Sequence, residues 1–308
     1  MDIIKKISDE YQVRKSEKQK SDFIDLIKTY CAENKLQCTE EKEIINRNII
    51  VGNLDDAKVI CTAHYDTCAV MPFPRFVAPQ NRRARIWYNV IIVAVISLVA
   101  LFIGFIVGMA SDSKQVAEIF SLFILILFPA QSLAGVPNKH TANDNTSGVM
   151  TLLSIMNNLH DTNRNKIAFV FFDNEELFLL GSRLFKRKHK LLMDEKLLIN
   201  FDCVSDGDNI LVVCSEEAQK SPKYNCLKKC FEENAKSFGK KPLFEKSSDA
   251  FYPSDQMGFR LGIGVVALNI SSRVGLYIER IHTRRDVIFK PKNIELLTKC
   301  ICDFIKHL

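Results

Sequence analysis

The chain has 308 residues, of which 47% are hydrophobic and 25% are charged, and its formal net charge is +6. A chain of this length suits one large α/β domain or two modest ones, and the average composition is that of a globular protein. The positive charge is mild, and no tract of lysine and arginine alternates with aromatic residues, so the sequence argues against nucleic-acid binding.

The N-terminus, residues 1–6, contains no apolar segment of the kind that a secretory signal requires. We therefore expect the ten cysteines to be reduced, because disulfides persist mainly in exported proteins. Their spacing contains no Cys-x-x-Cys pair, and we interpret most of them as small buried hydrophobic side chains.

The first predicted elements are one helix and two strands. Apolar side chains recur at helical spacing over residues 17–35, with lysines on the opposite face, which predicts an amphipathic helix. Residues 48–53 and 57–63 are two β-type runs separated by a polar turn, and we predict a strand for each of them.

Residues 86–136 form an almost entirely apolar block. The stretch from Val90 to Met109 carries no charge and is long enough for a helix to cross a bilayer core of roughly 30 Å. Trp87 and Tyr88 precede it, as at a membrane interface, and Ile119 to Val136 is a second, weaker uncharged stretch. We predict a hairpin of two transmembrane helices; the alternative is a buried insertion, such as a helical lid or a dimer surface.

A hairpin returns the chain to the side of the membrane that it left, so the rest of the protein would lie on one side. Basic residues before a span favour the cytoplasmic side. We therefore expect residues 1–85 and 137–308 to form a cytoplasmic domain, with a membrane surface as the partner of the basic cluster. This cluster consists of Arg75, Arg82, Arg83 and Arg85.

The remaining predicted elements alternate between helices and strands. A helix over residues 145–159 can be capped by Thr146 or Ser147, and a strand over residues 167–172 is apolar enough for burial on both faces. We predict a helix from Glu175 to about Lys190. The further strands are 197–201, 210–214 and 264–270, and the further helices are 222–238 and 291–307. This alternation predicts an α/β fold with a mostly parallel sheet covered on both faces.

Five short polar segments lie at the ends of predicted strands or in the turns that follow them. Buried charge is costly unless it is paired or bound to metal, so a metal centre is the simplest explanation of the set. Each segment alone also has an ordinary interpretation, such as a surface ion pair, a helix N-cap or an acidic first helical turn. The candidate residues in these segments are His64, Asp66, Asp144, Glu175, Glu176, Asp202 and His282.

Local geometry gives some of these residues a chemical role. His64 and Asp66 are two positions apart at a strand end and so point to the same side, where a carboxylate can fix the tautomer of a ligating histidine. Glu175 and Glu176 are adjacent and point in different directions, so one can bind metal while the other acts as general base.

The order of the five segments resembles the co-catalytic zinc aminopeptidase family that includes bacterial leucyl aminopeptidase, aminopeptidase Y and the glutamate carboxypeptidases. The resemblance covers about residues 45–72 and 138–308. It implies a three-layer α/β/α zinc-exopeptidase fold with a mixed, mostly parallel sheet, into which this chain inserts its helical hairpin. The matching segments are Ala63–Thr67, Ala142–Val149, Phe172–Glu176, Asn200–Asp202 and Ile281–Thr283.

The resemblance also implies two Zn²⁺ ions and a role for each candidate. Asp66 would orient His64, and Glu175 would be the general base. The implied ligands are His64 and Asp202 for one ion, Glu176 and His282 for the other, and Asp144 as the bridge.

The chain departs from this family in one spacing, because the segment between His64 and Asp144 is much longer than in the relatives. The surplus corresponds to the hairpin, residues 86–136, and its flanks. We expect this insertion in a loop at the active-site face, where residues 73–85 would shape the substrate entrance. Tyr252 and residues 254–256 lie in a turn where relatives shape the substrate pocket.

The sequence therefore predicts a dinuclear zinc-dependent exopeptidase, specifically an aminopeptidase that hydrolyses the N-terminal residues of peptides. One alternative is an acyltransferase that resembles glutaminyl cyclases and binds a single zinc ion. Another is a non-catalytic membrane protein on a peptidase fold. The preferred N-terminal residue, the metal used in the cell and the oligomeric state stay open.

Overall fold

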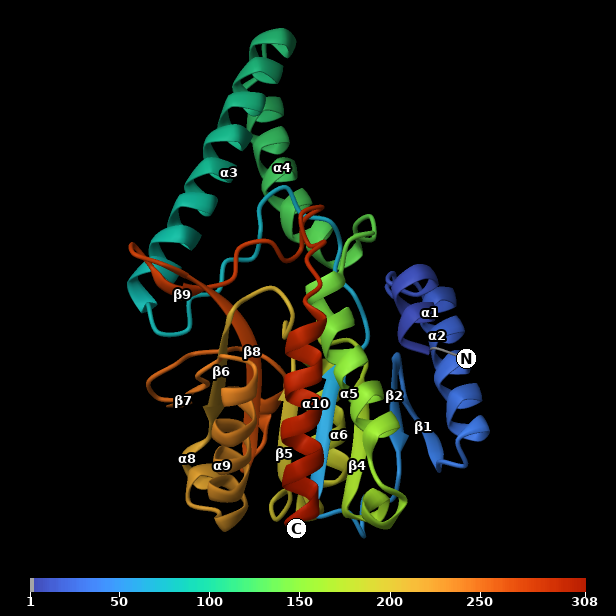
Figure 1. Cartoon of the computed structure of the whole chain (residues 1–308). Coiled ribbons are helices and arrows are strands. Elements are labelled where there is room, and N and C mark those ends of the chain that lie inside the picture. Colours follow the sequence, from blue (N-terminus) through green and yellow to red (C-terminus); the bar gives the residue numbers. More distant parts are fainter. Residues whose placement is uncertain (1–2) are drawn as a thin grey trace.

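A nine-stranded mixed sheet runs through the computed structural model, which describes residues 3–308 (Figure 1). The strand order is β1-β2-β4-β3-β5-β8-β6-β7, and β9 pairs with β8. The strands are β1 (Cys38–Glu43), β2 (Asn46–Val51), β3 (Val59–His64), β4 (Ile167–Phe172), β5 (Leu197–Phe201), β6 (Asn209–Cys214), β7 (Leu243–Lys246), β8 (Gly262–Ser271) and β9 (Gly275–Tyr277).

The central strands β4, β3, β5 and β8 are parallel. Strands β3, β4 and β5 are buried along their whole length, as the continuous apolar runs predict. In the register, His64 at the end of β3 lies beside Phe172 at the end of β4. The carboxyl ends of these strands therefore meet at one edge of the sheet, where ligands bind in open α/β sheets.

Helices cover both faces of the sheet, in three layers (Figure 1). Val59 and Cys61 of β3 pack in one core with residues of α2, α5, α9 and α10. Ile60, between them, faces the opposite core with Phe185 of α6 and Met193 of α7. The helices of this domain are α1 (Ile3–Glu10), α2 (Glu17–Glu33), α5 (Ser147–Asn158), α6 (Leu180–Lys188), α7 (Lys190–Met193), α8 (Glu216–Gln219), α9 (Pro222–Ser237) and α10 (Pro291–Lys306). Three short helical segments complete it: η1 (Ala142–Thr146), η2 (Asp161–Lys166) and η3 (Asp255–Gly258).

Two local predictions are wrong. The helix expected from Glu175 begins only at Leu180, because Phe178 and Leu179 have positive φ angles that end any regular helix there. The cap expected from Thr146 or Ser147 is absent; instead the side-chain Oδ1 of Asn145 accepts a hydrogen bond from the Gly148 N–H at 3.0 Å. The acidic pair at 175 and 176 therefore lies in a turn, not on a helix.

The apolar block forms a hairpin of two helices, α3 (Arg82–Ser111) and α4 (Lys114–Ala134), that projects from the domain (Figure 1). Helix α3 begins earlier than the apolar run because the Asn81 side chain caps it at the Ala84 N–H. Both helices are long and apolar enough to cross a membrane. Many apolar side chains are exposed, such as Phe102 at 64% and Met109 at 71%, so the hairpin is not packed into the domain core.

The two hairpin helices approach each other closely at small residues. A Cβ atom at Gly104 would lie 2.0 Å from Ser121 Oγ, and one at Gly108 would lie 2.6 Å from Ala117 Cβ. Small residues four apart on a helix allow a second helix to approach this closely. The division into a peptidase domain (1–85 and 137–308) and an inserted hairpin (86–136) stays a prediction.

Candidate metal centre

The predicted metal ligands converge at the carboxyl edge of the sheet, in two groups. In the first group, His64 Nε2 lies 3.3 Å from Asp144 Oδ1 and 3.6 Å from Asp202 Oδ1. His64 ends β3, Asp202 directly follows β5, and Asp144 lies in the turn η1 before α5. The parallel strands β3 and β5 thus bring His64 and Asp202 together at their carboxyl ends.

The second group shares Asp144 with the first. His282 Nε2 lies 3.2 Å from Asp144 Oδ2 and 3.4 Å from Glu176 Oε1. Each oxygen of the Asp144 carboxylate therefore faces one group, which is the arrangement that a bridging ligand requires. His140, the histidine close to Asp144 in sequence, belongs to neither group.

The chemistry of these groups fits metal ions. Burial favours the neutral form of Asp144, but the adjacent imidazoles of His282 and His64 outweigh this effect and hold the pKa of Asp144 below its ordinary value. Buried polar atoms normally have partners, and those without one need an explanation. In the described part of the chain, four buried ligand atoms have no hydrogen-bond partner: His64 Nε2, Asp202 Oδ1, Glu176 Oε1 and His282 Nε2.

Asp66 links His64 to the acidic turn. Its carboxylate accepts hydrogen bonds from the backbone N–H groups of Glu175 at 3.0 Å and Glu176 at 3.2 Å. One carboxylate oxygen lies 3.5 Å from His64 Nδ1, and the backbone carbonyl of Asp66 lies 3.1 Å from the same nitrogen. The predicted contact with His64 is present, and the stronger contacts of Asp66 fix the turn that carries Glu175 and Glu176.

Two residues that the sequence analysis did not select hold Asp144 in place. The buried carboxylate of Asp286 accepts hydrogen bonds from the backbone N–H groups of Asn143 at 2.8 Å and Asp144 at 3.0 Å. The Asn145 side chain donates to the Phe201 carbonyl at 2.9 Å and so ties this turn to the end of β5. Only the position of Asp286, close to His282 in sequence, could have indicated its role.

Cys68 is a further residue near the second group that the sequence did not indicate. Its Sγ and the ligand atoms of Glu176 and His282 all lie within 4.8 Å of one another. Burial raises the pKa of the Cys68 thiol well above its ordinary value. It was predicted as one of the small buried hydrophobic side chains, and it is indeed buried and free of any disulfide.

The turn near residue 252 is hydrogen-bonded to the end of β5, which Asp202 directly follows. The Tyr252 hydroxyl donates to the Asp202 carbonyl at 2.9 Å, and the Asn200 side chain donates to Ser254 Oγ at 2.9 Å and to Gln256 Oε1 at 3.0 Å. Burial raises the pKa of Asp255 to about 7. Tyr252 and residues 254–256, which the resemblance places near the substrate pocket, are not among the residues that line the cavity beside the centre. Phe251 and Pro253 from the same segment line it.

That cavity has a volume of about 650 Å³ and lies between the metal centre and the base of the hairpin. Glu175, Glu176 and His282 line it on the side of the centre. Arg75, expected in a basic cluster at a membrane surface, also lines this cavity. Its apolar walls come from the segment after β3 and from both hairpin helices: Met71, Phe73, Pro74, Phe76, Tyr88, Ile92, Phe128 and Leu133.

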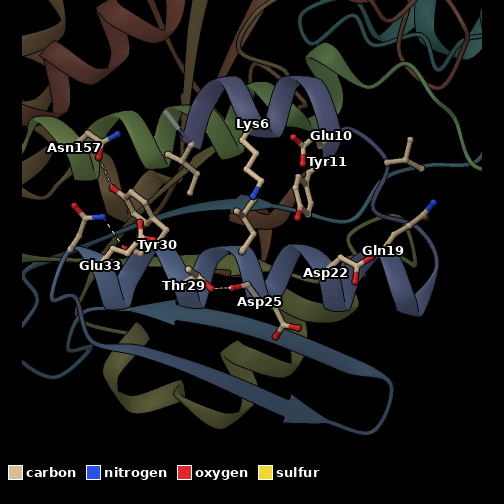
Figure 2. A pocket seen from close by; sticks show the side chains of 14 residues that line it. Lys6, Glu10, Tyr11, Gln19, Asp22, Asp25, Thr29, Tyr30, Glu33 and Asn157 are labelled. Atoms are coloured by element: carbon tan, nitrogen blue, oxygen red, sulfur yellow. Dashed lines mark hydrogen bonds between the residues drawn. The ribbon is translucent and has the colours of Figure 1, made fainter. Parts of the chain in front are cut away.

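A second cavity of about 650 Å³ lies between α1 and α2 (Figure 2). Tyr30 donates a hydrogen bond to Asn157 at its edge, and acidic side chains, such as Asp22 and Asp25, line it together with Lys6. None of the predicted site residues lines this cavity. The candidate site is therefore the one at the carboxyl edge of the sheet.

Comparison with known protein families gives one match. Residues 125–304 match the model of a family described as peptidase family M28. The matched range is more than half of the chain and contains all the candidate residues except His64 and Asp66. A search of curated proteins found no significant match.

Solved structures share the fold. A Zn-dependent exopeptidase from Parabacteroides distasonis has a TM-score of 0.59 at 13% identity, over 98% of this chain and 94% of that one. A glutaminyl cyclase from Bacteroides thetaiotaomicron, bound to N-acetylhistamine, has a TM-score of 0.58 at 14% identity, over 96% and 92%. A leucine aminopeptidase precursor from the same organism has a TM-score of 0.56 at 14% identity, over 96% and 91%. The predicted fold class is confirmed.

Proposed function

We propose, since the chain belongs to peptidase family M28, that it is a dinuclear zinc-dependent aminopeptidase that removes N-terminal residues from peptides. One observation carries this proposal. Two groups of buried ligand atoms share the Asp144 carboxylate, and four of those atoms lack a hydrogen-bond partner among residues 3–308. Carboxylates and imidazoles in such groups are suitable ligands for zinc.

Each residue near the centre then has one role. His64 and Asp202 would hold one ion, Glu176 and His282 the other, and Asp144 would bridge them. When bound, the two ions would supply Lewis acidity to the scissile carbonyl and to the attacking water. A free α-amine on the substrate would be held beside the carboxylates of the cavity.

Glu175 would take the proton from the attacking water and deliver it to the leaving amine. Its side chain lines the cavity and is buried. Burial, as the largest effect, and the nearby Glu176 carboxylate raise the pKa of Glu175 well above its ordinary value. A raised pKa suits a group that must accept a proton and release it again near neutral pH.

The test uses the full chain purified in detergent, with hydrolysis of aminoacyl-arylamides and zinc content by mass spectrometry as readouts. Glu175→Gln should retain zinc and lose about 10²- to 10⁴-fold in kcat, as expected on removal of a general base. Glu195→Gln, at an exposed position, is the matched control. Near-normal hydrolysis by a zinc-loaded Glu175→Gln variant would refute the assigned base.

The second candidate is a glutaminyl cyclase-like acyltransferase, since a glutaminyl cyclase is among the structures with this fold. It predicts one zinc ion per chain and pyroglutamate formation from peptides that begin with glutamine, without peptide hydrolysis. Two ions per chain together with hydrolysis would reject it. A purified protein that binds zinc but has neither activity would instead support the third candidate, a non-catalytic membrane protein.

We also propose that the hairpin spans a membrane and that the peptidase domain lies on its cytoplasmic side. Support comes from the length, apolar composition and exposed surface of α3 and α4. The basic residues at the start of α3, Arg82, Arg83 and Arg85, favour the cytoplasmic side.

A further inference from the structure

The segment that carries Arg75 is fixed to the loop that carries His282. The Met71 N–H donates a hydrogen bond to the His282 carbonyl at 2.8 Å, and the Arg75 N–H donates to the Ile281 carbonyl at 3.3 Å. Tyr88 of α3 donates to the Pro74 carbonyl at 2.6 Å and holds the same segment from the other side. The backbone at Arg75 is therefore positioned relative to the metal centre by contacts on both sides.

Arg75 is an exposed residue at the cavity, and its guanidinium pairs with no other side chain that the structure describes. Over residues 3–308, no hydrogen bond or ion pair involves the Arg75 side chain, although it lines the cavity with Glu175, Glu176 and His282. Arg85, the other arginine of the cavity, is engaged: it donates to the carbonyls of Ala78 at 2.9 Å and Pro79 at 2.8 Å. It also lies 4.8 Å from the centre of the Phe251 ring.

The charges around Arg75 keep it ionised. Desolvation by the cavity walls lowers the pKa of its guanidinium, although the residue keeps an exposed surface, but the carboxylates of Glu175 and Glu176 outweigh this effect and raise the pKa above its ordinary value. In a loaded centre, Glu176 and the other ligand carboxylates would be neutralised by the metal ions they bind. The guanidinium would then face the cavity as a cation with free donors.

We propose that Arg75 binds a carboxylate of the substrate, so that the preferred substrates are short peptides with a carboxylate near the scissile bond. This inference rests on the proposed function. A guanidinium binds a carboxylate through two parallel hydrogen bonds, which gives both affinity and orientation. A cavity of about 650 Å³ has the size of a small-ligand site, and its carboxylate side can hold the amine of the same peptide.

The carboxylate has two possible sources, an acidic side chain or the C-terminus of a short peptide, and three dipeptides distinguish them. Leucylglutamine amide has no carboxylate. Leucylglutamine has only the C-terminal carboxylate, and the C-terminal amide of leucylglutamate has only the side-chain carboxylate. Comparing each acidic dipeptide with the neutral one gives a preference ratio in kcat/KM.

The wild-type chain should prefer at least one acidic dipeptide, and Arg75→Gln should reduce that preference by about 10- to 100-fold, as expected for a lost charge-assisted hydrogen bond. Arg75→Lys should keep part of the preference, because the charge stays but the two-pronged geometry is lost. Arg83→Gln, at an exposed position in the first turn of α3, is the matched control and should leave the ratio unchanged. Thermal unfolding of each variant checks that it folds.

Binding without turnover separates this inference from the proposed function. Calorimetric titration of the zinc-loaded chain with each dipeptide should show weaker binding of the acidic dipeptide to Arg75→Gln, even if no hydrolysis occurs. A wild-type chain that binds or cleaves all three dipeptides equally would overturn the inference. So would an Arg75→Gln variant that loses activity on all three by the same factor, since that is the result of a structural role.

Discussion

Asp286 is the residue whose carboxylate most directly fixes the bridging position. It accepts hydrogen bonds from the Asn143 and Asp144 N–H groups, and burial raises its pKa to about 7. Asp286→Ala should leave both N–H groups unpaired and let the Asp144 carboxylate shift. We expect zinc affinity to fall about 10- to 100-fold, as for other residues that orient metal ligands. Competition with a chelator measures the affinity.

The control for this experiment is Asp208→Ala, because Asp208 is exposed and its carboxylate pairs with Lys290 at the surface. Its zinc affinity should equal that of the wild type. Equal affinities for Asp286→Ala and wild type would mean that the Asn145 side chain alone holds the bridging turn.

Arg14 is a fully buried cation that forms no ion pair with a carboxylate of residues 3–308. It donates to the carbonyls of Tyr11 and Tyr65 and to Thr146 Oγ1, and it lies 5.4 Å from the centre of the Phe23 ring. Burial lowers its pKa to about 10. It thereby joins the N-terminal segment to the loops that follow His64 and Asp144.

Arg14→Ala should lower the free energy of unfolding by about 3–5 kcal/mol, because it leaves a cavity and unpaired carbonyl groups in the interior. Chemical denaturation in detergent measures this change. Arg164→Ala removes a partly exposed arginine that pairs with Asp161, and it should cost less than about 1 kcal/mol. A similar cost for the two variants would contradict the structural role of Arg14.

The sequence predicts the ligands of the centre better than the residues that support them. His64 and Asp202 come directly from strand ends, and the ends of parallel strands must meet at one edge. Asp286 could not be predicted in the same way, because a loop without periodicity brings it to the site. Arg75 belongs to residues 73–85, which the sequence predicts at the substrate entrance, and it does line the cavity. Cys68 has no distinguishing feature in the sequence, since its proximity to the second group depends on how the chain leaves β3.

At the scale of elements, the close packing of α3 against α4 requires a residue without a side chain at Gly104. Gly104→Leu should force the two helices apart, because its Cβ atom would already lie within 2.6 Å of the Ala117 carbonyl oxygen. We expect a loss of about 1–3 kcal/mol, the usual cost of overpacking, and an earlier loss of helical signal on heating in detergent. Phe105→Leu, at an exposed neighbouring position, is the control. Equal unfolding curves for the two variants would rule out the close contact.

The edge strand β1 is attached to the end of α6 through Glu41. Its buried carboxylate lies 2.7 Å from His189 Nε2 and 2.8 Å from Lys188 Nζ. Burial raises the pKa of Glu41, but these hydrogen bonds outweigh it, so the pKa is lower than in the unfolded chain. The stabilisation is then present above the unfolded value, about 4.3, and is lost as the pH falls through the folded pKa.

Glu41→Gln should therefore lower the free energy of unfolding by about 1–3 kcal/mol at pH 7, and the difference from wild type should shrink below about pH 4. Urea denaturation at several pH values checks this. Glu33→Gln, at an exposed position of α2, should change little at any pH. A difference for Glu41→Gln that stays constant with pH would mean that packing, not charge, accounts for it.

Most central elements follow from the sequence, and the exceptions have local causes. The continuous apolar run at β4 predicts a strand buried on both faces, and the structure contains it with the predicted bounds. The edge strand β1 was missed, because it is largely polar and gains its hydrogen bonds from β2. Residues 175–179 form a turn where the sequence predicts the start of a helix, because the acidic pair Glu175 and Glu176 is also typical of a helix N-terminus.

At the scale of the whole molecule, the proposed membrane attachment depends on the hairpin alone. The full chain should stay in the membrane pellet after a carbonate wash. A chain in which a short Gly/Ser linker replaces residues 98–127 should be soluble and should still bind zinc, because it keeps Ile92 and Phe128 at the cavity. A full chain that is soluble without detergent would refute the transmembrane proposal. Protease accessibility in intact cells tests the cytoplasmic side.

Both ends of the hairpin are hydrogen-bonded to residues 70–74, the segment after β3 that borders the cavity. Tyr88 of α3 donates to the Pro74 carbonyl, and Gln131 of α4 donates to the Val70 carbonyl at 3.0 Å. Transmembrane helices change their tilt to match bilayers of different thickness. In the proposed membrane-bound state, a change of tilt would move Tyr88 and Gln131 relative to each other and alter the width of the cavity mouth. The lipid composition of the membrane would then influence which substrates can enter the cavity.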